Sequence, residues 1–197
     1  MSTLAITHTP DELAAGAASD ESAFSELARR YRRGLQAHCY RMLGSYEESE
    51  DLTQETLLRA WRSRESFQGR SSFRTWLYRI ATNRCLSALE QSGRSIPVDG
   101  PELDSILAQR ESLLATSDDG PDVQVVGRET IEVAFLVAVR YLPPRQRAVL
   151  FLRDVLGWSA KETAELLETS VAAVNSALLR ARATLRDQLR SRGVATA

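Results

Sequence analysis

The sequence predicts an all-α protein built from two small helical domains that are joined by an acidic, flexible linker. Apolar residues recur at helical spacing in two long stretches, 21–91 and 129–189. Between them, residues 91–127 hold four Gly and three of the six Pro among Asp and Ser, a composition that breaks helices. With 197 residues and 43% hydrophobic content, the chain can form one good core or two small ones, and the linker favours two.

The expected boundaries follow from this pattern. They are a flexible tail (1–20), a first domain (21–92), the linker (93–127), a second domain (128–190) and a short tail (191–197).

The first expected helix starts near Ser19-Asp20-Glu21 and ends at Gly44-Ser45. Its apolar stripe begins with Phe24 and Leu27 and continues to Leu43. Four arginines fall on the opposite face, where they either face solvent or contact a nucleic acid or protein partner: Arg29, Arg30, Arg32 and Arg33.

The next helix is expected from Tyr46 to about Arg64, with Leu52, Thr56 and Ala60 facing inward. Its outer side carries an unusual mixture of acids, an amide and a bare leucine: Asp51, Gln54, Glu55 and Leu58. A solvated face with one exposed Leu is one explanation. A surface for a protein partner is the other, because exposed apolar residues beside polar ones are typical of interfaces.

A helix over Ser72 to about Gln91 combines a core stripe with a cationic face. The residues that project away from the stripe are Arg74, Tyr78, Arg79, Asn83, Arg84 and Ser87. Arginines neutralise phosphates, an aromatic ring stacks on an unpaired base, and an Asn amide hydrogen-bonds a base edge, so this set suits single-stranded DNA. Trp76 has the register of the core stripe, which favours packing over a role as a base wedge.

The second half predicts a helix over 129–141, a helix begun by Pro143-Pro144 and stopped by Gly157, and then a helix-turn-helix. Ser159 and Glu162 form a capping box for its first helix. Glu168-Thr169-Ser170 makes the turn without a glycine. The recognition helix buries Val174, Leu178, Ala181 and Leu185, and its expected DNA-facing residues are Ser170, Ala172, Ala173, Asn175, Ser176, Leu179, Arg180 and Arg182.

The formal net charge of −1 results from cancellation between charged blocks. Residues 29–46 carry five Arg and no acids, and residues 140–197 carry ten bases against five acids. The basic blocks therefore coincide with the helices expected to face DNA. Two His and two Cys, with no convergent acid-base cluster, argue against an enzyme and a metal site. Cys39 and Cys85 are expected to be reduced and buried in a cytoplasmic protein without a membrane segment.

Residues 51–61 and 67–86 closely resemble the promoter-melting domain of bacterial sigma-70 family factors, in particular the extracytoplasmic-function (ECF) group. The resemblance implies that Asp51, Gln54, Glu55 and Leu58 bind core RNA polymerase, through its beta-prime and beta subunits. It further implies that the cationic face of 72–91 contacts the minus-10 promoter element and that the recognition helix contacts the minus-35 element. Promoter DNA and an anti-sigma factor are the other partners that it suggests, with no cofactor and no small-molecule substrate.

Two departures from the family pattern concern the second domain. Glu168 stands where a Gly is usual, and the groove face is poor in side chains that read bases. The string from Val171 to Leu178 resembles a subgroup that usually bears an extra C-terminal SnoaL-like domain, and this sequence is expected to lack that domain.

Two alternatives stay open. The chain could be a free-standing helix-turn-helix regulator that binds duplex DNA without polymerase. The linker, with seven acids against one Arg over 99–122, could be a simple tether or could occupy the cationic path of nascent RNA.

Overall fold

The computed structural model describes residues 21–67, 71–92 and 128–191, and every regular element in these ranges is helical. The elements are α2 (Glu21–Leu43), α3 (Tyr46–Arg62), the short 3-10 turn η1 (Arg64–Ser66), α4 (Phe73–Ser92), α6 (Arg128–Tyr141), α7 (Pro144–Leu150), the π-helical turn η2 (Phe151–Val155), α8 (Ala160–Leu166) and α9 (Val171–Ser191). Residues 1–20, 68–70, 93–127 and 192–197 lie outside the described residues, and with them the predicted N-terminal tail, the linker and most of the predicted C-terminal tail.

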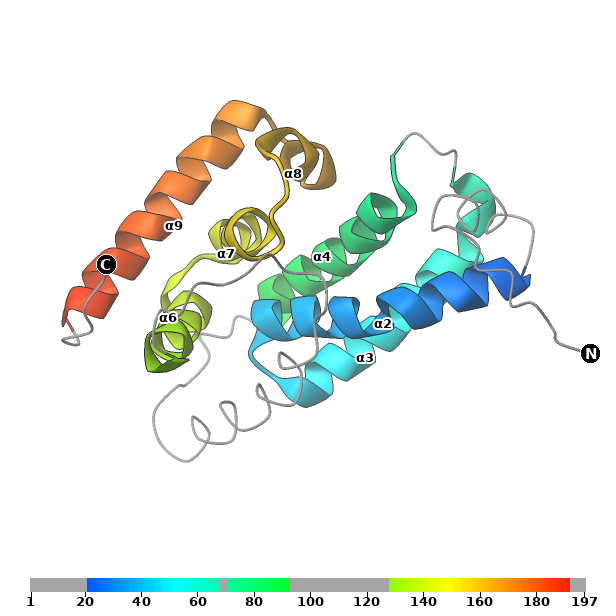
Figure 1. Cartoon of the computed structure of the whole chain (residues 1–197), viewed down its shortest axis with the longest axis horizontal. Coiled ribbons are helices and arrows are strands. Elements are labelled where there is room, and N and C mark those ends of the chain that lie inside the picture. Colours follow the sequence, from blue (N-terminus) through cyan, green and yellow to red (C-terminus); the bar gives the residue numbers. More distant parts are fainter. Residues whose placement is uncertain (1–20, 68–70, 93–127, 192–197) are drawn as a thin grey trace, which may run out of the picture.

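The N-terminal unit consists of α2, α3 and α4 (Figure 1). Gly44 ends α2 by adopting a φ of 72°, and the side chain of Ser45 then accepts a hydrogen bond from the Glu48 amide to begin α3. Ser72 plays the same capping part for α4, since its hydroxyl lies 3.0 Å from the amide of Thr75. These local signals place the helices within a few residues of the predicted bounds.

An aromatic cluster fills one end of the N-terminal unit. Phe73 packs edge-on against Phe24 and lies 5.5 Å from Trp76, between ring centroids. Phe67 contacts both Phe73 and Trp76. Trp76 therefore packs against the core, as its register predicts.

The C-terminal unit consists of α6 to α9, and its helix-turn-helix is α8 followed by α9. The capping box predicted at the start of α8 is confirmed, because the side chains of Ser159 and Glu162 each bond the other's backbone amide. Gly157 has a φ of 68° and stops the preceding turn. The predicted inner stripe of α9 is buried at Val174, Leu178 and Ala181.

The turn between α8 and α9 is a Schellman motif. The Thr169 amide bonds the Ala164 carbonyl at 2.9 Å, and the Glu168 amide reaches the Glu165 carbonyl at 3.4 Å. Glu168 takes the left-handed conformation itself, with a φ of 52°. Gly adopts this conformation more readily, so the chain makes the turn with backbone strain at Glu168 that a Gly would avoid.

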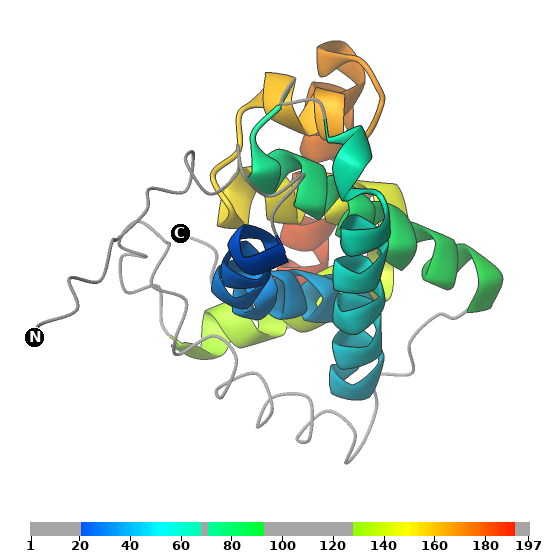
Figure 2. The same ribbon diagram turned by 90° about the vertical axis from the view of Figure 1, so that its right-hand side faces the viewer.

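The two units pack against each other, with α4 and α2 on one side and α6, α7 and α8 on the other (Figures 1 and 2). The rings of Tyr40 and Phe135 stack across this boundary with centroids 5.5 Å apart. Buried residues of both units belong to one hydrophobic cluster. The two helical units agree with the prediction, but the expectation of two separate cores is wrong, because aromatic side chains from both units meet at the boundary.

Arg147 of α7 is the polar centre of that boundary. It is buried, and its guanidinium donates to the carbonyl of Met42 at the end of α2 and to the carbonyls of Val139 and Leu142 near the end of α6. Carbonyls at helix ends carry partial negative charge and otherwise have no intrahelical partner, so one cation satisfies the ends of two helices. Burial lowers the pKa of Arg147 to about 10, which still leaves it charged at neutral pH.

No helix in the described part of the chain is long and apolar enough to cross a membrane.

Candidate nucleic-acid and polymerase interfaces

The outer face of α3 is exposed where the sequence predicts a partner surface. Asp51 and Gln54 are exposed, and Leu58 keeps 47% of its surface open to solvent. The inward residues Leu52 and Ala60 are buried, so the register of the helix agrees with the prediction. An exposed Leu flanked by polar residues on a rigid helix is a suitable anchor for a protein partner.

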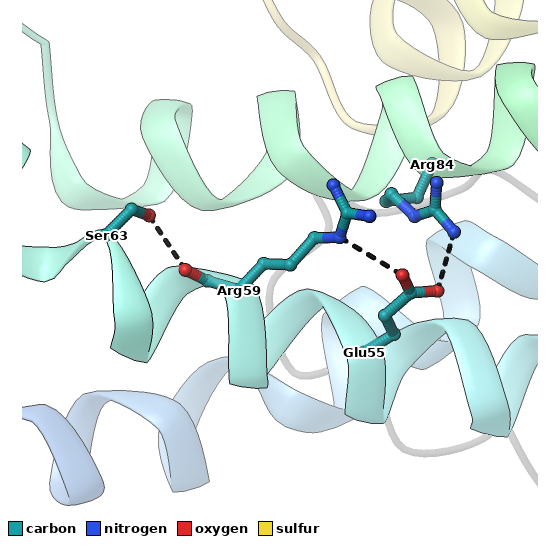
Figure 3. A network of polar contacts seen from close by, with 4 residues as sticks. All are labelled: Glu55, Arg59, Ser63 and Arg84. Atoms are coloured by element: carbon teal, nitrogen blue, oxygen red, sulfur yellow. Dashed lines mark hydrogen bonds and ion pairs between the residues drawn. The ribbon is translucent and has the colours of Figure 1, made fainter.

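Glu55 differs from its neighbours on this face because it is already engaged. One of its carboxylate oxygens lies 2.7 Å from the Arg84 guanidinium of α4, and the other lies 3.1 Å from Arg59 one turn along α3 (Figure 3). The hydrogen bond from Arg84 lowers the pKa of Glu55, against the opposing effect of burial. Glu55 therefore joins the predicted polymerase surface to the predicted DNA surface.

The predicted DNA-contacting residues of α4 are in three different environments. Asn83 is exposed, and Arg74, Arg79, Arg84 and Ser87 are half-buried. Tyr78, expected to project away from the core, is only 3% exposed, which corrects its predicted placement. A Cβ on Gly34 of α2 would stand 2.8 Å from the Tyr78 hydroxyl, so the absence of a side chain at Gly34 makes room for this ring.

Tyr78 is buried because it packs between the two units: its ring lies 5.3 Å from the His38 ring of α2, between centroids, and it also contacts the C-terminal unit. The indole of Trp158 lies 5.4 Å from the Tyr78 ring, between centroids, and the Arg74 guanidinium lies 5.3 Å from the indole centroid. The Arg79 guanidinium donates to the Glu165 carbonyl of α8 at 3.3 Å. Three of the six predicted minus-10 residues thus contact the C-terminal unit.

The predicted minus-35 residues all lie on the exposed side of α9 or immediately before it. Leu179 is the most open large apolar residue among those described, with 72% of its surface exposed. Arg182 is held by a bidentate ion pair with Asp154 of η2, at 2.7 and 2.9 Å. The exposed residues of this face are Ser170, Ala172, Ala173, Asn175, Ser176, Leu179, Arg180 and Arg182.

Three potentially reactive side chains lie in the described core: His38, Cys39 and Cys85. No group of three or more His, Cys, Asp or Glu side chains among the described residues could hold a metal ion. Cys39 and Cys85 are buried, free thiols. His38 is fully buried against Thr82, and burial lowers its pKa from 6.5 to about 3, with the positive charge of Arg41 acting in the same direction. These side chains belong to the packing of the N-terminal unit.

The sequence predicts no role for Trp158 or Arg147, although both side chains make contacts at the boundary between the units. Trp158 directly follows the helix-stopping Gly157, outside any periodic stripe. A large aromatic residue at such a corner is a signal that it packs against something beyond its own helix, but the sequence does not say against what.

Comparisons with known proteins place both units. The family model for Sigma-70 region 2 matches residues 27–95, and the model for Sigma-70 region 4 matches residues 132–185. The chain is 49% identical over 175 residues to the ECF RNA polymerase sigma factor SigG of Mycobacterium tuberculosis, which covers 82% of this chain and 47% of that protein. It is 35% identical over 179 residues to the ECF RNA polymerase sigma factor SigW of Bacillus subtilis, covering 87% of this chain and 91% of that protein.

Two solved structures are similar to the chain over most of its length. CnrH, in its complex with the cytosolic domain of CnrY, gives a TM-score of 0.64 at 27% identity and covers 91% of this chain and 96% of that one. The sigma factor SigJ of Mycobacterium tuberculosis gives a TM-score of 0.53 at 27% identity, covering 84% of this chain and 53% of that one. The chain spans about half the length of the SigG relatives that it matches.

Proposed function

The chain belongs to the sigma-70 family of RNA polymerase sigma factors, in its ECF group, and from this premise we propose that it directs core polymerase to specific promoters. In this role it binds core polymerase, recognises minus-10 and minus-35 elements and stabilises the opened strand. It supplies recognition, and the polymerase supplies the chemistry.

Each proposed contact is assigned to one surface of the described chain. The outer face of α3, with Asp51, Gln54 and Leu58, docks on core polymerase. Asn83, Arg79 and Arg84 of α4 contact the minus-10 element as it opens. The exposed face of α9 enters the major groove at the minus-35 element, where its few polar residues leave much of the binding to phosphates and shape.

One observation carries the proposal. Within the stretch that matches Sigma-70 region 2, an exposed Leu beside acids on α3 lies next to an Arg- and Asn-bearing helix, and the Glu55–Arg84 ion pair connects the two surfaces. A free-standing regulator has no need of the first surface. This arrangement therefore favours the sigma role over the helix-turn-helix regulator.

Core binding tests the first assignment. Asp51→Arg and Leu58→Asp are expected to weaken capture of the full chain by core polymerase, because both change an exposed contact surface without touching the core. Glu65→Arg is a matched charge reversal just beyond α3, at a largely exposed side chain, and should bind core like the wild type. Equal capture of the wild type and the three variants would mean that α3 is not part of the polymerase interface.

Transcription tests the function itself. The full chain, added to core polymerase, should start RNA synthesis from a subset of a promoter panel, and permanganate should then detect unpaired thymines at the minus-10 element. The regulator alternative instead predicts tight binding to duplex DNA by the chain alone and no new start sites.

The acidic stretch 99–122 lies outside the described residues. Its seven acids against one Arg support the proposal that in the holoenzyme it occupies a cationic channel built for nascent RNA. Replacing it with a neutral Gly/Ser linker of equal length should change abortive initiation and promoter escape. Unchanged RNA products would make it a tether only.

A further inference from the structure

The corner formed by Trp158 and α8, here called the α8 corner, covers part of α4. It is the site where the helix-turn-helix of one unit meets the cationic face of the other (Figure 1). Trp158 is 4% exposed, so its burial depends on this contact as well as on its own unit. The covered residues, Arg74, Tyr78 and Arg79, are among those proposed to hold the opened strand.

The groups that the α8 corner presents match the chemistry of single-stranded DNA. The indole of Trp158 contacts the Tyr78 ring at an interplanar angle of 51° and lies against the Arg74 guanidinium, and an unpaired base can make the same kinds of ring and cation–π contact. Hydrogen bonds from Ser159 lower the pKa of the Glu162 carboxylate, and the positive charge of Arg74 acts in the same direction, as it would on a phosphate. The Glu165 carbonyl accepts a hydrogen bond from Arg79.

Two donors at the α8 corner are left unsatisfied, as are several other buried polar atoms elsewhere in the described residues. Within the described residues, the indole N–H of Trp158 and the Nε of Arg79 are both buried without a hydrogen-bond partner. Each such group costs free energy that a hydrogen-bonded group does not. A strand that displaces the α8 corner exposes the indole N–H of Trp158 to water and offers phosphate acceptors to Arg79, so both donors gain partners in exchange for the lost bond to Glu165.

We propose that the α8 corner is an internal mimic of single-stranded DNA, in which Trp158 occupies on α4 the binding place of an unpaired base. The free chain thereby blocks its own minus-10 surface until the units separate. This inference rests on the proposed function of α4 and goes beyond it, because it assigns a competitor for the site within the same chain.

The packing of Arg147 stabilises this closed form of the chain, in which the two units are in contact. Separating the units removes its guanidinium from the Met42 carbonyl and breaks the stacking of Tyr40 on Phe135. Binding of core polymerase to α3 and to the C-terminal unit would supply the free energy for that step. In the absence of polymerase, the apparent affinity for DNA is reduced by the fraction of open chains.

The test uses the full chain and a fluorescein-labelled oligothymidylate of about ten nucleotides, since stacking on aromatic side chains tolerates any base. Trp158→Ala should bind this probe about 10-fold or more tightly than the wild type, as expected if the open fraction rises from about a tenth to nearly all. Trp61→Ala is the matched control, because it removes a partly buried indole in the N-terminal unit away from the α8 corner. Adding Arg74→Ala to Trp158→Ala should abolish the gain.

A second measurement does not depend on the stability of Trp158→Ala. The double variant Trp61→Phe/Trp76→Phe keeps Trp158 as the sole tryptophan, since the sequence has three. Its fluorescence should shift to the red as the probe saturates, because the indole leaves a buried site. An unshifted spectrum at saturation would overturn the proposal, as would equal probe affinities of Trp158→Ala and the wild type. If the holoenzyme still transcribes in that case, the sigma role stands and only the internal mimic is wrong.

Discussion

The guanidinium of Arg84 lies 2.7 Å from the carboxylate of Glu55, so one ion pair joins α4 to α3. Arg84 belongs to the proposed DNA surface and Glu55 to the proposed polymerase surface. Both side chains are partly screened from solvent, with about a third or less of each exposed. A partner that draws either residue away must break this pair, which couples the two surfaces.

A double-mutant cycle on this pair is expected to give a coupling energy of about 0.2–1 kcal/mol, the range of partly exposed ion pairs. Glu55→Gln and Arg84→Gln should each lower the free energy of unfolding in urea slightly, and the double variant should lower it by less than their sum. Arg59→Gln is the control, because it removes the weaker contact of Glu55, at 3.1 Å, and leaves Arg84 in place. Additive losses in the cycle would mean that the pair contributes nothing.

Asn83→Ala should relax discrimination at one minus-10 position by roughly 1–3 kcal/mol, the size of a bidentate base contact. The side chain is exposed, so stability should hardly change. The measurement is transcription from promoters substituted at each minus-10 position. Gln91→Ala removes another exposed amide at the end of the same helix and should leave selectivity intact. If both variants rank the promoters as the wild type does, Asn83 does not read a base.

Acid should weaken the fold through His38, whose pKa is about 3 in the folded chain against 6.5 when solvated. Between these values the unfolded chain binds a proton that the folded chain excludes, so stability is lost as pH falls. For one proton, the free energy of unfolding falls by about 1.4 kcal/mol per pH unit. Urea unfolding at several pH values between 6.5 and 5 measures this dependence. The window lies above the range where Glu55 and Glu162 titrate, because the pKa values of both are lowered from 4.5.

His38→Gln is the control for that experiment. Its amide can still bond the Thr82 hydroxyl, which lies 2.9 Å from the His38 ring nitrogen, but it cannot titrate. The variant should lose the slope between pH 6.5 and 5. A slope that persists would assign the acid sensitivity to another group.

Glu168→Gly should raise the free energy of unfolding by about 1 kcal/mol, since Gly adopts the left-handed conformation without the steric cost that a side chain incurs. Thermal or urea unfolding measures the gain. Glu165→Gly is the matched control within α8, where a helical Gly should instead destabilise by about 1 kcal/mol. A stability loss in Glu168→Gly would show that the Glu168 side chain has a favourable role.

The sequence predicts what local signals determine. The capping box of Ser159 and Glu162, the stop at Gly44 and the outward register of Leu58 and Leu179 all follow from spacing and residue type. Helical periodicity describes one helix at a time, so it could not reveal contacts between units. Periodicity therefore predicts an outward-facing Tyr78 and gives no partner for Trp158, whereas the two rings meet across the boundary.

The buried guanidinium of Arg147 has a consequence for cooperativity. It serves the helix ends of both units, so unfolding of the N-terminal unit removes one acceptor from a buried charge, and unfolding of the C-terminal unit leaves the Met42 carbonyl without this donor. The free chain should then melt in a single transition whose calorimetric and van't Hoff enthalpies agree, although its family models divide it into two regions. Two regions of sequence would thus behave as one thermodynamic unit until polymerase separates them.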